Sequence, residues 1–281
     1  MVLNPFPLYA YGISNKGKVR DSNEDAFNIR EDLGLFILSD GMGGHKAGEK
    51  ASHMAITCLP ELVDHELQLM KFDDEECLAG ALKEAVTKLS EMICKRAEED
   101  ASLHGMGATL MTCLIRNATA AVSHMGDSRM YLLRSGVLER LTEDHTIPGM
   151  LLQLGKITQK EALNHPARHM LTRHVGMCDS ILPEVSLLEL EEGDRLLLCS
   201  DGLTNMVSER EIGQIILDEP DLEKACKKLV NTANEAGGAD NITVVLIQCE
   251  DWEKRSRKKK SKISVRLKVG ASLRRCTTEI T

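Results

Sequence analysis

The 281 residues carry 43 acidic and 35 basic side chains, for a net charge of −8, and 42% of the residues are hydrophobic. These values are typical of a globular protein and exclude a disordered or fibrous chain. No apolar run approaches the roughly 18 residues that cross a bilayer, and the N-terminus lacks the basic and long apolar regions of a secretory signal. We therefore expect no membrane span and a cytoplasmic location.

Short apolar runs of strand type recur along the chain. They cover residues 35–38, 110–115, 118–124, 129–133, 137–141, 196–199 and 242–248. The four runs between residues 110 and 141 are joined by turns of two to four residues. Turns this short predict that the four strands form one antiparallel meander.

Helical patterns lie between and after these runs, at residues 47–59, 75–100, 207–217 and 221–236. In the second pattern, apolar residues recur at spacings of three and four, which predicts one stripe that packs on a sheet. They are Leu78, Leu82, Ala85, Leu89, Met92 and Ile93. Grouped strands with long helices beside them favour an α+β architecture in layers over alternating βαβ units. One domain, residues 1–250, accounts for all of these elements.

The remaining residues, 251–281, form a basic tail. They hold eleven Lys or Arg and three Asp or Glu, a balance of +8, which leaves residues 1–250 at −16. An acidic body repels nucleic acid, whereas a basic tail attracts anionic partners. Apolar and polar residues alternate over 263–269, so the tail could pair with a sheet edge as a half-buried strand. We favour a flexible arm, because only four apolar residues take part.

The cysteines point to a reducing environment. There are nine, an odd number, and no two have the C-x-x-C spacing of a structural zinc site. Several, such as Cys113, Cys199 and Cys226, lie in apolar stretches. We therefore expect reduced thiols in the core and no disulfide framework.

One sequence device occurs twice. Residues 35–41 and 196–202 each combine an apolar run with Ser-Asp-Gly, which places Asp40 and Asp201 directly after buried strands. Glycine lets the backbone turn tightly at the end of each strand. A rigid strand end holds a carboxylate where it can bind a ligand with defined geometry.

Acidic residues also recur in five short segments with glycine, asparagine or arginine. The segments are 20–25 (RDSNED), 40–45 (DGMGGH), 126–129 (GDSR), 201–202 (DG) and 237–241 (GGADN). Carboxylates brought together repel one another unless cations lie among them. Oxygen ligands without sets of His or Cys favour Mg²⁺ or Mn²⁺. Two such ions that share a carboxylate can bridge a water and lower its pKa, so that hydroxide attacks phosphorus.

In this order, the segments resemble the motif series of the protein phosphatase 2C family, in its bacterial-type branch. The series reads R-x-x-N-E-D, D-G-M-G-G, G-[AT]-T, G-D-S-R, D-H-[ST], S-D-G-L and A-D-N-x-[TS], and it extends from about residue 10 to 248. The resemblance implies an αββα sandwich with the site at one end of two antiparallel sheets and a mobile flap at 145–180. It also implies metal-dependent hydrolysis of phosphoserine and phosphothreonine without a covalent intermediate.

The resemblance further implies two ions, Mn²⁺ or Mg²⁺, with a ligand role for each matching residue. Asp40 would bridge the two ions. Glu24 and the carbonyl oxygen of Gly41 would complete the shell of one ion. Asp201 and Asp240 would hold the other ion.

The remaining matching residues would assist these ligands. Asp127 would offer a third, weaker metal position, and Asn205 stands where some members have an aspartate for that ion. Arg20 would bind the substrate phosphate, as a bidentate cation can. Asp25 and Asn241 would lie behind the ligands and orient them or their waters.

Some residues depart from the family pattern or invite a second interpretation. Met42 stands where many eukaryotic members carry a histidine proposed as general acid, so a metal-bound water would protonate the leaving group. His45 could substitute, but we expect it to have a structural role at a helix start. Arg129, Asp144 and His145 are also expected to be structural.

The main alternative function is a pseudophosphatase that keeps the fold and senses a metal or a partner without catalysis. Retention of every expected ligand and of Arg20 argues against it. A regulatory subclass that acts on one phosphorylated antagonist protein usually has a degraded motif series, which this chain does not. The expected partners are phosphorylated proteins, such as those of a cognate serine/threonine kinase, and the chain is expected to be a monomer. Nucleic acid is not expected as a partner, because the lysines at 258–260 lack interleaved aromatic residues.

Overall fold

The computed structural model describes residues 6–249, except residues 44, 71, 73 and 179–182 and the side chain of His45. The basic tail expected at residues 251–281 lies outside this part of the chain. Within the described residues, we find no helix with the length and apolar character that crossing a membrane requires.

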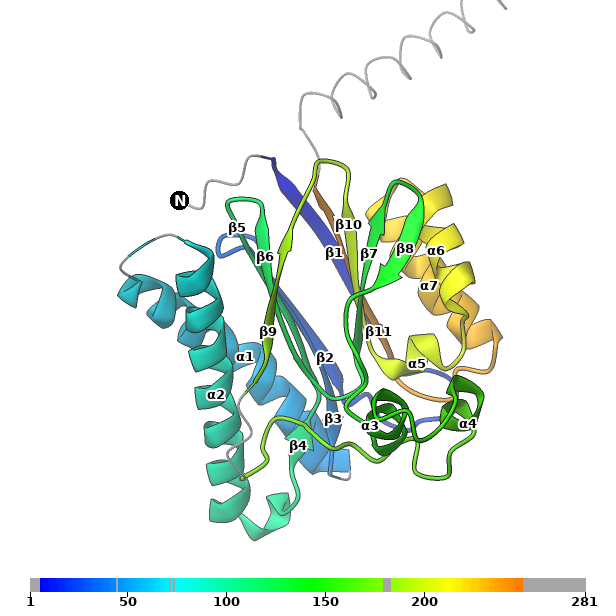
Figure 1. Ribbon diagram of the computed structural model, residues 1–281. Coiled ribbons are helices and arrows are strands. Elements are labelled where there is room, and N and C mark those ends of the chain that lie inside the picture. The colour runs from blue at the N-terminus through cyan, green and yellow to red at the C-terminus, as the bar shows by residue number, and fades with distance from the viewer. Residues whose placement is uncertain (1–5, 44, 71, 73, 179–182, 250–281) are drawn as a thin grey trace, which may run out of the picture.

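Two antiparallel sheets form the centre of the molecule (Figure 1). The first sheet has the strand order β1-β11-β10-β7-β8, and the second has β2-β3-β5-β6-β9 with the short β4 beside β3. The strands are β1 Leu8–Asn15, β2 Asp25–Arg30, β3 Leu35–Met42, β4 Gly107–Ala108, β5 Leu110–Arg116, β6 Thr119–Met125, β7 Arg129–Arg134, β8 Val137–Arg140, β9 Val185–Glu189, β10 Arg195–Cys199 and β11 Ile242–Cys249.

Helices cover both outer faces of the sheet pair, as Figure 1 shows. α1 and α2 pack on the second sheet, and α6 and α7 pack on the first. The helices are α1 His45–Leu69, α2 Glu75–Glu99, α3 Ile147–Gln153, α4 Gln159–Leu163, α5 Asp201–Thr204, α6 Glu209–Asp218 and α7 Leu222–Glu235, with a 3₁₀ turn at Ala101–Leu103. The αββα sandwich is therefore confirmed, and His45 is the first residue of α1 as expected.

The packing of β3 shows why its sequence has apolar residues at successive positions instead of alternate ones. Leu35 and Ile37 pack beneath α1 and α2, whereas Phe36 and Leu38 point into the core between the two sheets. All four side chains are fully buried. Because successive residues of a strand face opposite sides, a strand that is covered on both sides needs apolar residues at every position.

The predicted four-strand meander is wrong in one respect. β5 pairs with β6 in the second sheet, and β7 pairs with β8 in the first sheet. The chain crosses from one sheet to the other at the turn that follows β6, where Gly126 has a φ of +114°. Glycine and polar residues mark where a chain turns, but the partner of each strand depends on packing far along the sequence.

The strands that the patterns do not predict are mostly at sheet edges. β1, β2 and β9 each end the order of their sheet. β1 and β9 contain no fully buried residue, and neither strand has a run of buried apolar residues. In α2 the predicted stripe is buried except for Met92, which is 42% exposed.

The structure corrects a second expectation, that the cysteines are reduced and form no disulfide. Cys94 of α2 and Cys178 form a disulfide with a Cα–Cα distance of 5.4 Å, although 84 residues separate them. The other six cysteines within the described residues are free, and Cys113, Cys199 and Cys226 are buried as predicted. A pair this far apart in sequence leaves no spacing pattern, so only the fold reveals it.

Candidate metal centre

Five aspartates come together at one end of the sandwich. Asp40 lies near the end of β3, and Asp25 begins β2 directly opposite Asp40 in the strand register. Asp201 begins α5, immediately after β10, and Asp240 lies two residues before β11. Asp127 is in the turn between β6 and β7. Asp40 interacts electrostatically with each of the other four, so segments from both sheets contribute to one acidic cluster.

Loss of contact with solvent makes the charged form costly for four of these aspartates. Loss of solvent raises the pKa of Asp25 and of Asp127 to about 7, and repulsion from Asp201 adds to both shifts. The pKa of Asp40 is raised well above its ordinary value by burial and then by repulsion from Asp25 and the other acids. Burial and the charge of Asp240 raise the pKa of Asp201 as well. Compensating positive charge would restore these groups to carboxylates.

Two oxygen atoms in the cluster lack a hydrogen-bond partner. Asp25 Oδ1 and Asp201 Oδ1 are buried and have no hydrogen-bond partner. The second oxygen of each carboxylate is held, because Ser200 Oγ donates to Asp25 Oδ2 at 2.8 Å and Asn205 Nδ2 donates to Asp201 Oδ2 at 3.0 Å. A buried polar atom without a partner is costly, so the donor set fits a hard divalent cation with oxygen ligands.

The cluster is looser than a closed coordination shell. Within the described residues, no three of its acids place ligand atoms within 4.8 Å of one another. One reason is Asp240, whose Oδ2 accepts from Arg20 Nη2 at 2.7 Å. The Arg20 side chain remains 54% exposed, so its guanidinium lies at the solvent side of the cluster, where a phosphate could reach it.

Glu24 and Gly41 lie beside each other. The backbone N–H of Gly41 donates to the Glu24 carbonyl oxygen at 3.1 Å. A Cβ atom on Gly41 would collide with the backbone carbonyl of Gly48 in α1. Glycine is therefore required where β3 meets α1, and this close approach holds the Glu24 segment against Asp40.

Asn241 ties this segment to β11. Its Oδ1 accepts from the Glu24 N–H at 2.8 Å, and its Nδ2 donates to the carbonyl oxygens of Lys16 and Ser22 at 2.9 Å each. Only 6% of the surface of Asn241 is exposed. One amide thus positions the chain around Glu24, next to Asp240 in sequence.

Several hydroxyl groups that the sequence argument left without a role also position the acids. Thr109 Oγ1 accepts from the Asp40 N–H at 2.9 Å and lies 2.8 Å from Ser128 Oγ, so it links Asp40 to the turn that carries Asp127. Ser39 Oγ donates to the Thr109 carbonyl oxygen at 2.6 Å. In the sequence, the sign of these positioning roles was the serine that precedes the aspartate in both Ser-Asp-Gly segments. Ser39 and Ser200 are both fully buried.

The profile of the family described as Protein phosphatase 2C matches residues 16–246. The chain belongs to the protein phosphatase 2C family. It is an enzyme of that class, and all the acids of the cluster lie within the matched residues.

Individual members of the family resemble the chain over most of its length. The serine/threonine phosphatase Stp of Listeria monocytogenes is 35% identical over 244 residues, which cover 86% of this chain and 96% of that protein. The crystal structure of the Mycobacterium tuberculosis serine/threonine phosphatase PstP/Ppp has a TM-score of 0.75 and 37% identity, and the match covers 86% of this chain and 99% of that one. The structure of the PstP catalytic domain in complex with two manganese ions has a TM-score of 0.73 and 35% identity, and the match covers 87% and 99% of the two chains.

Asp144 and His145 attach the start of residues 145–180, the segment predicted to be a flap, to the rest of the domain. Asp144 accepts from Arg129 Nε at 3.0 Å and from Arg129 Nη2 at 2.7 Å. The N–H of His145 donates to the Gly126 carbonyl oxygen at 2.9 Å, and its ring stacks on His124 with centroids 4.3 Å apart. Burial lowers the pKa of His145 to about 4. These contacts agree with the structural roles expected for the three residues.

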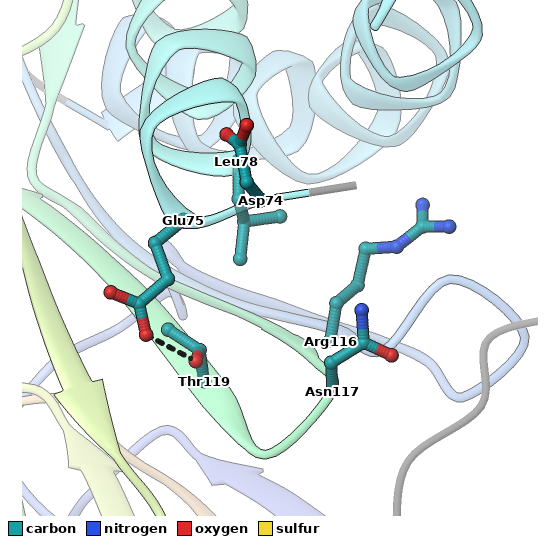
Figure 2. Close-up of a pocket in the computed structure, with 6 residues that line it drawn as sticks. All are labelled: Asp74, Glu75, Leu78, Arg116, Asn117 and Thr119. Carbon is teal, nitrogen blue, oxygen red and sulfur yellow. Dashed lines mark hydrogen bonds between the residues drawn. The ribbon is translucent and has the colours of Figure 1, made fainter. Parts of the chain in front are cut away.

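A separate hollow of about 240 Å³ lies at the other end of β5 from Asp40. Figure 2 shows its lining, where Glu75 accepts a hydrogen bond from Thr119 at 2.9 Å. The lining residues are Asp74, Glu75, Leu78, Arg116, Asn117 and Thr119. None of the residues expected at the metal centre borders this hollow, so it is separate from the acidic cluster.

Proposed function

We propose that this phosphatase hydrolyses phosphoserine and phosphothreonine in proteins, by direct attack of water and with two divalent ions, Mn²⁺ or Mg²⁺. The observation that carries the proposal is the cluster of aspartates, in which Asp25, Asp40, Asp127 and Asp201 have raised pKa values and two oxygens have no partner. Family membership and the two manganese ions of the related PstP domain support it.

The proposed ligands lie at strand ends and in the turns and helix start that adjoin them. Asp40 would be shared by the two ions, with Glu24 and the carbonyl oxygen of Gly41 on one side. Asp201 and Asp240 would serve the other ion, and Asp127 a third, weaker position. When bound, the ions would offset the charge of these acids and lower the pKa of a water so that hydroxide forms near neutral pH.

The surrounding residues keep the ligands in place. Thr109 fixes the backbone of Asp40 on both sides, since its N–H also donates to the Asp40 carbonyl oxygen at 2.8 Å. Asp25, which is 6% exposed, would act behind the ligands through its bond from Ser200. Asn241 would hold the Glu24 segment in register with Asp240. Ligands on strand ends that are held in this way lose little conformational freedom when an ion binds.

Arg20 would bind the phosphoryl group. Its guanidinium is half-exposed and engages Asp240 through one nitrogen atom, Nη2. The remaining N–H donors lie at the solvent side and suit the oxygens of a phosphate, which guanidinium groups bind in a forked geometry. Its position next to a proposed metal ligand would orient the phosphate toward the attacking water.

Replacing Arg20 with alanine is expected to raise KM for a phosphopeptide about tenfold, because hydrogen bonds to a charged group are lost, with Mn²⁺ affinity unchanged. Steady-state kinetics and a Mn²⁺ titration measure the two effects. Arg30→Ala is the matched control, since Arg30 makes a similar 2.7 Å pair with Asp32 on the surface. A weaker Mn²⁺ affinity with an unaltered KM would instead assign Arg20 to holding Asp240.

The substrate class is tested with three peptides that differ only in phosphoserine, phosphothreonine or phosphotyrosine. Chelated protein should be inactive, and Mn²⁺ should start the release of phosphate from the first two peptides. A pseudophosphatase would bind these peptides and Mn²⁺ without hydrolysis, and that result would overturn the proposal.

We propose the phosphoproteins of a serine/threonine kinase as physiological substrates and a monomer as the acting species. A comparison of phosphoproteomes with and without the gene tests the first point.

A further inference from the structure

The disulfide joins two parts of the molecule that the proposed metal centre depends on. Cys94 lies in α2, which packs on the second sheet. Cys178 lies in the segment through which the chain leaves the flap, beyond α3 and α4. The Cα–Cα distance of 5.4 Å suits a disulfide, and the bond closes a loop that contains β4 to β8 and the flap helices.

The segment before Cys178 is bonded to the strand beside Asp40. The N–H of Val175 donates to the Ala108 carbonyl oxygen at 2.9 Å, and the N–H of Ala108 donates back at 3.2 Å. Ala108 in turn pairs with Gly41 in β3. A backbone ladder thus runs from the segment at Val175, through β4, to the glycine next to Asp40.

The same segment rests on α2 close to the disulfide. The N–H of Gly176 donates to Ser90 Oγ at 3.1 Å, and a Cβ atom on Gly176 would lie 2.7 Å from Ile93 Cγ2. Gly176 therefore allows a close approach between the segment and the helix. Cys94 is one turn beyond Ser90, so the covalent bond reinforces this contact and, through it, the ladder.

Solvent can reach the disulfide. Cys178 is exposed and Cys94 keeps 9% of its surface accessible. By contrast, Cys113 and Cys199 are fully buried. Disulfides that are exposed and easily reduced are the regulatory kind, whereas structural ones resist reduction.

We propose that Cys94 and Cys178 form a reversible redox site that couples the thiol–disulfide balance of the surroundings to the metal centre. In the oxidised protein the bond holds residues 175–178 on α2 and supports the ladder beneath Gly41. In the reduced protein this support is lost, and the centre binds its ions more weakly. Weaker ion binding would also lower turnover, and this consequence rests on the proposed phosphatase function. The effects on the ladder and on ion binding do not.

The reaction requires a small-molecule thiol–disulfide couple. For oxidation, the Cys178 thiolate attacks a small disulfide, forming a mixed disulfide and releasing one small thiolate. The Cys94 thiolate then attacks the Cys178 sulfur, which forms the bond and releases the second thiolate. The two protons lost by the cysteines end on the two small thiols, so two protein thiols are oxidised as one disulfide is reduced. Reduction follows the same steps in reverse.

The test compares the full chain equilibrated in oxidised and in reduced glutathione. Mass spectrometry of alkylated peptides should find a Cys94–Cys178 bond only in the oxidised sample. Amide hydrogen exchange at Val175 and Gly176 should be at least about tenfold faster after reduction, because local opening becomes easier. The dissociation constant for Mn²⁺ should rise about threefold or more, a size typical of coupling between sites, and both changes should reverse on reoxidation.

The variant Cys94→Ser/Cys178→Ser separates the redox site from other effects. It should behave as the reduced protein in both buffers, with a Tm lower than that of the oxidised protein by roughly 10 °C, given the length of the closed loop. Cys77→Ser, which removes a free cysteine of the same helix, should respond as the wild type does.

Two results would overturn the proposal: no bond between these cysteines in the oxidised sample, or exchange and Mn²⁺ affinity that are equal in both redox states. A lower Tm on reduction with no change at Val175 or in Mn²⁺ affinity would mean a purely structural bond. Redox-dependent exchange and Mn²⁺ affinity in a protein that hydrolyses no phosphate ester would leave the redox site in place and reject the phosphatase proposal.

Discussion

Asp40→Asn and Asp201→Asn are each expected to lower kcat by at least about 100-fold, a loss of about 2.7 kcal/mol of transition-state stabilisation. Each change removes the negative charge of a proposed ligand and with it the hold on an ion and its water. Steady-state kinetics on a phosphoserine peptide with saturating Mn²⁺ measure the effect. If either variant retains more than about a tenth of the wild-type kcat, the ligand assignment is wrong.

The fold should survive these substitutions. Asp40 is held in β3 through its backbone bonds to Thr109, and asparagine has the same shape as aspartate. Because burial and repulsion raise the pKa of Asp40 in the metal-free protein, its neutral replacement relieves unfavourable charge. The metal-free Asp40→Asn protein should therefore melt no lower than the metal-free wild type at pH 8. Asp32→Asn, at a side chain 63% exposed, is the control and should keep full activity.

Removal of divalent ions is expected to abolish turnover and to lower the melting temperature. An ion present at 100 times its dissociation constant stabilises the folded state by about 2.7 kcal/mol. For a domain of this size, that corresponds to about 5–10 °C in Tm. Calorimetry with chelator and with added Mn²⁺ measures the difference, and Mn²⁺ should restore both activity and Tm. Full turnover after exhaustive chelation would refute the proposed metal dependence.

The gain in Tm on adding Mn²⁺ should be larger at pH 8 than at pH 5. In the metal-free folded protein, the pKa values of Asp25 and Asp127 are raised from 3.8 to about 7. Between pH 4 and 7 the folded state thus binds more protons than the unfolded state. Protonation of Asp25 and Asp127 therefore stabilises the metal-free fold at low pH, and this stabilisation is lost as the pH rises through about 7. Protons compete with the ion at pH 5 but not at pH 8. An equal gain at both values would show that these acids do not respond to the ion.

Much of the fold could be predicted from local patterns, and the misses have physical causes. α2 was expected at 75–100 and is observed at Glu75–Glu99, because a buried stripe and an N-cap at Asp74 define it locally. β1 and β9, at sheet edges, contain no fully buried residue and have no run of buried apolar residues. The crossing between sheets after β6 and the Cys94–Cys178 bond depend on contacts between distant residues, which no local pattern records.

The amino-acid sequence by itself determined which residues are proposed to carry the chemistry. Acids next to glycine in an ordered motif series identified Asp40, Asp201 and Asp240 as candidate metal ligands, because hard cations bind carboxylates that are held at rigid turns. Only the tertiary structure decided how these acids meet. It brought Asp25 opposite Asp40, raised the pKa values of Asp25, Asp40, Asp127 and Asp201 through loss of solvent and mutual repulsion, and placed Thr109 and Asn241 behind the proposed ligands. The reason is that hydrogen bonds, burial and repulsion depend on distances between groups that lie far apart in sequence, such as Lys16 and Asn241, which are 225 residues apart. Those distances exist only in the folded chain.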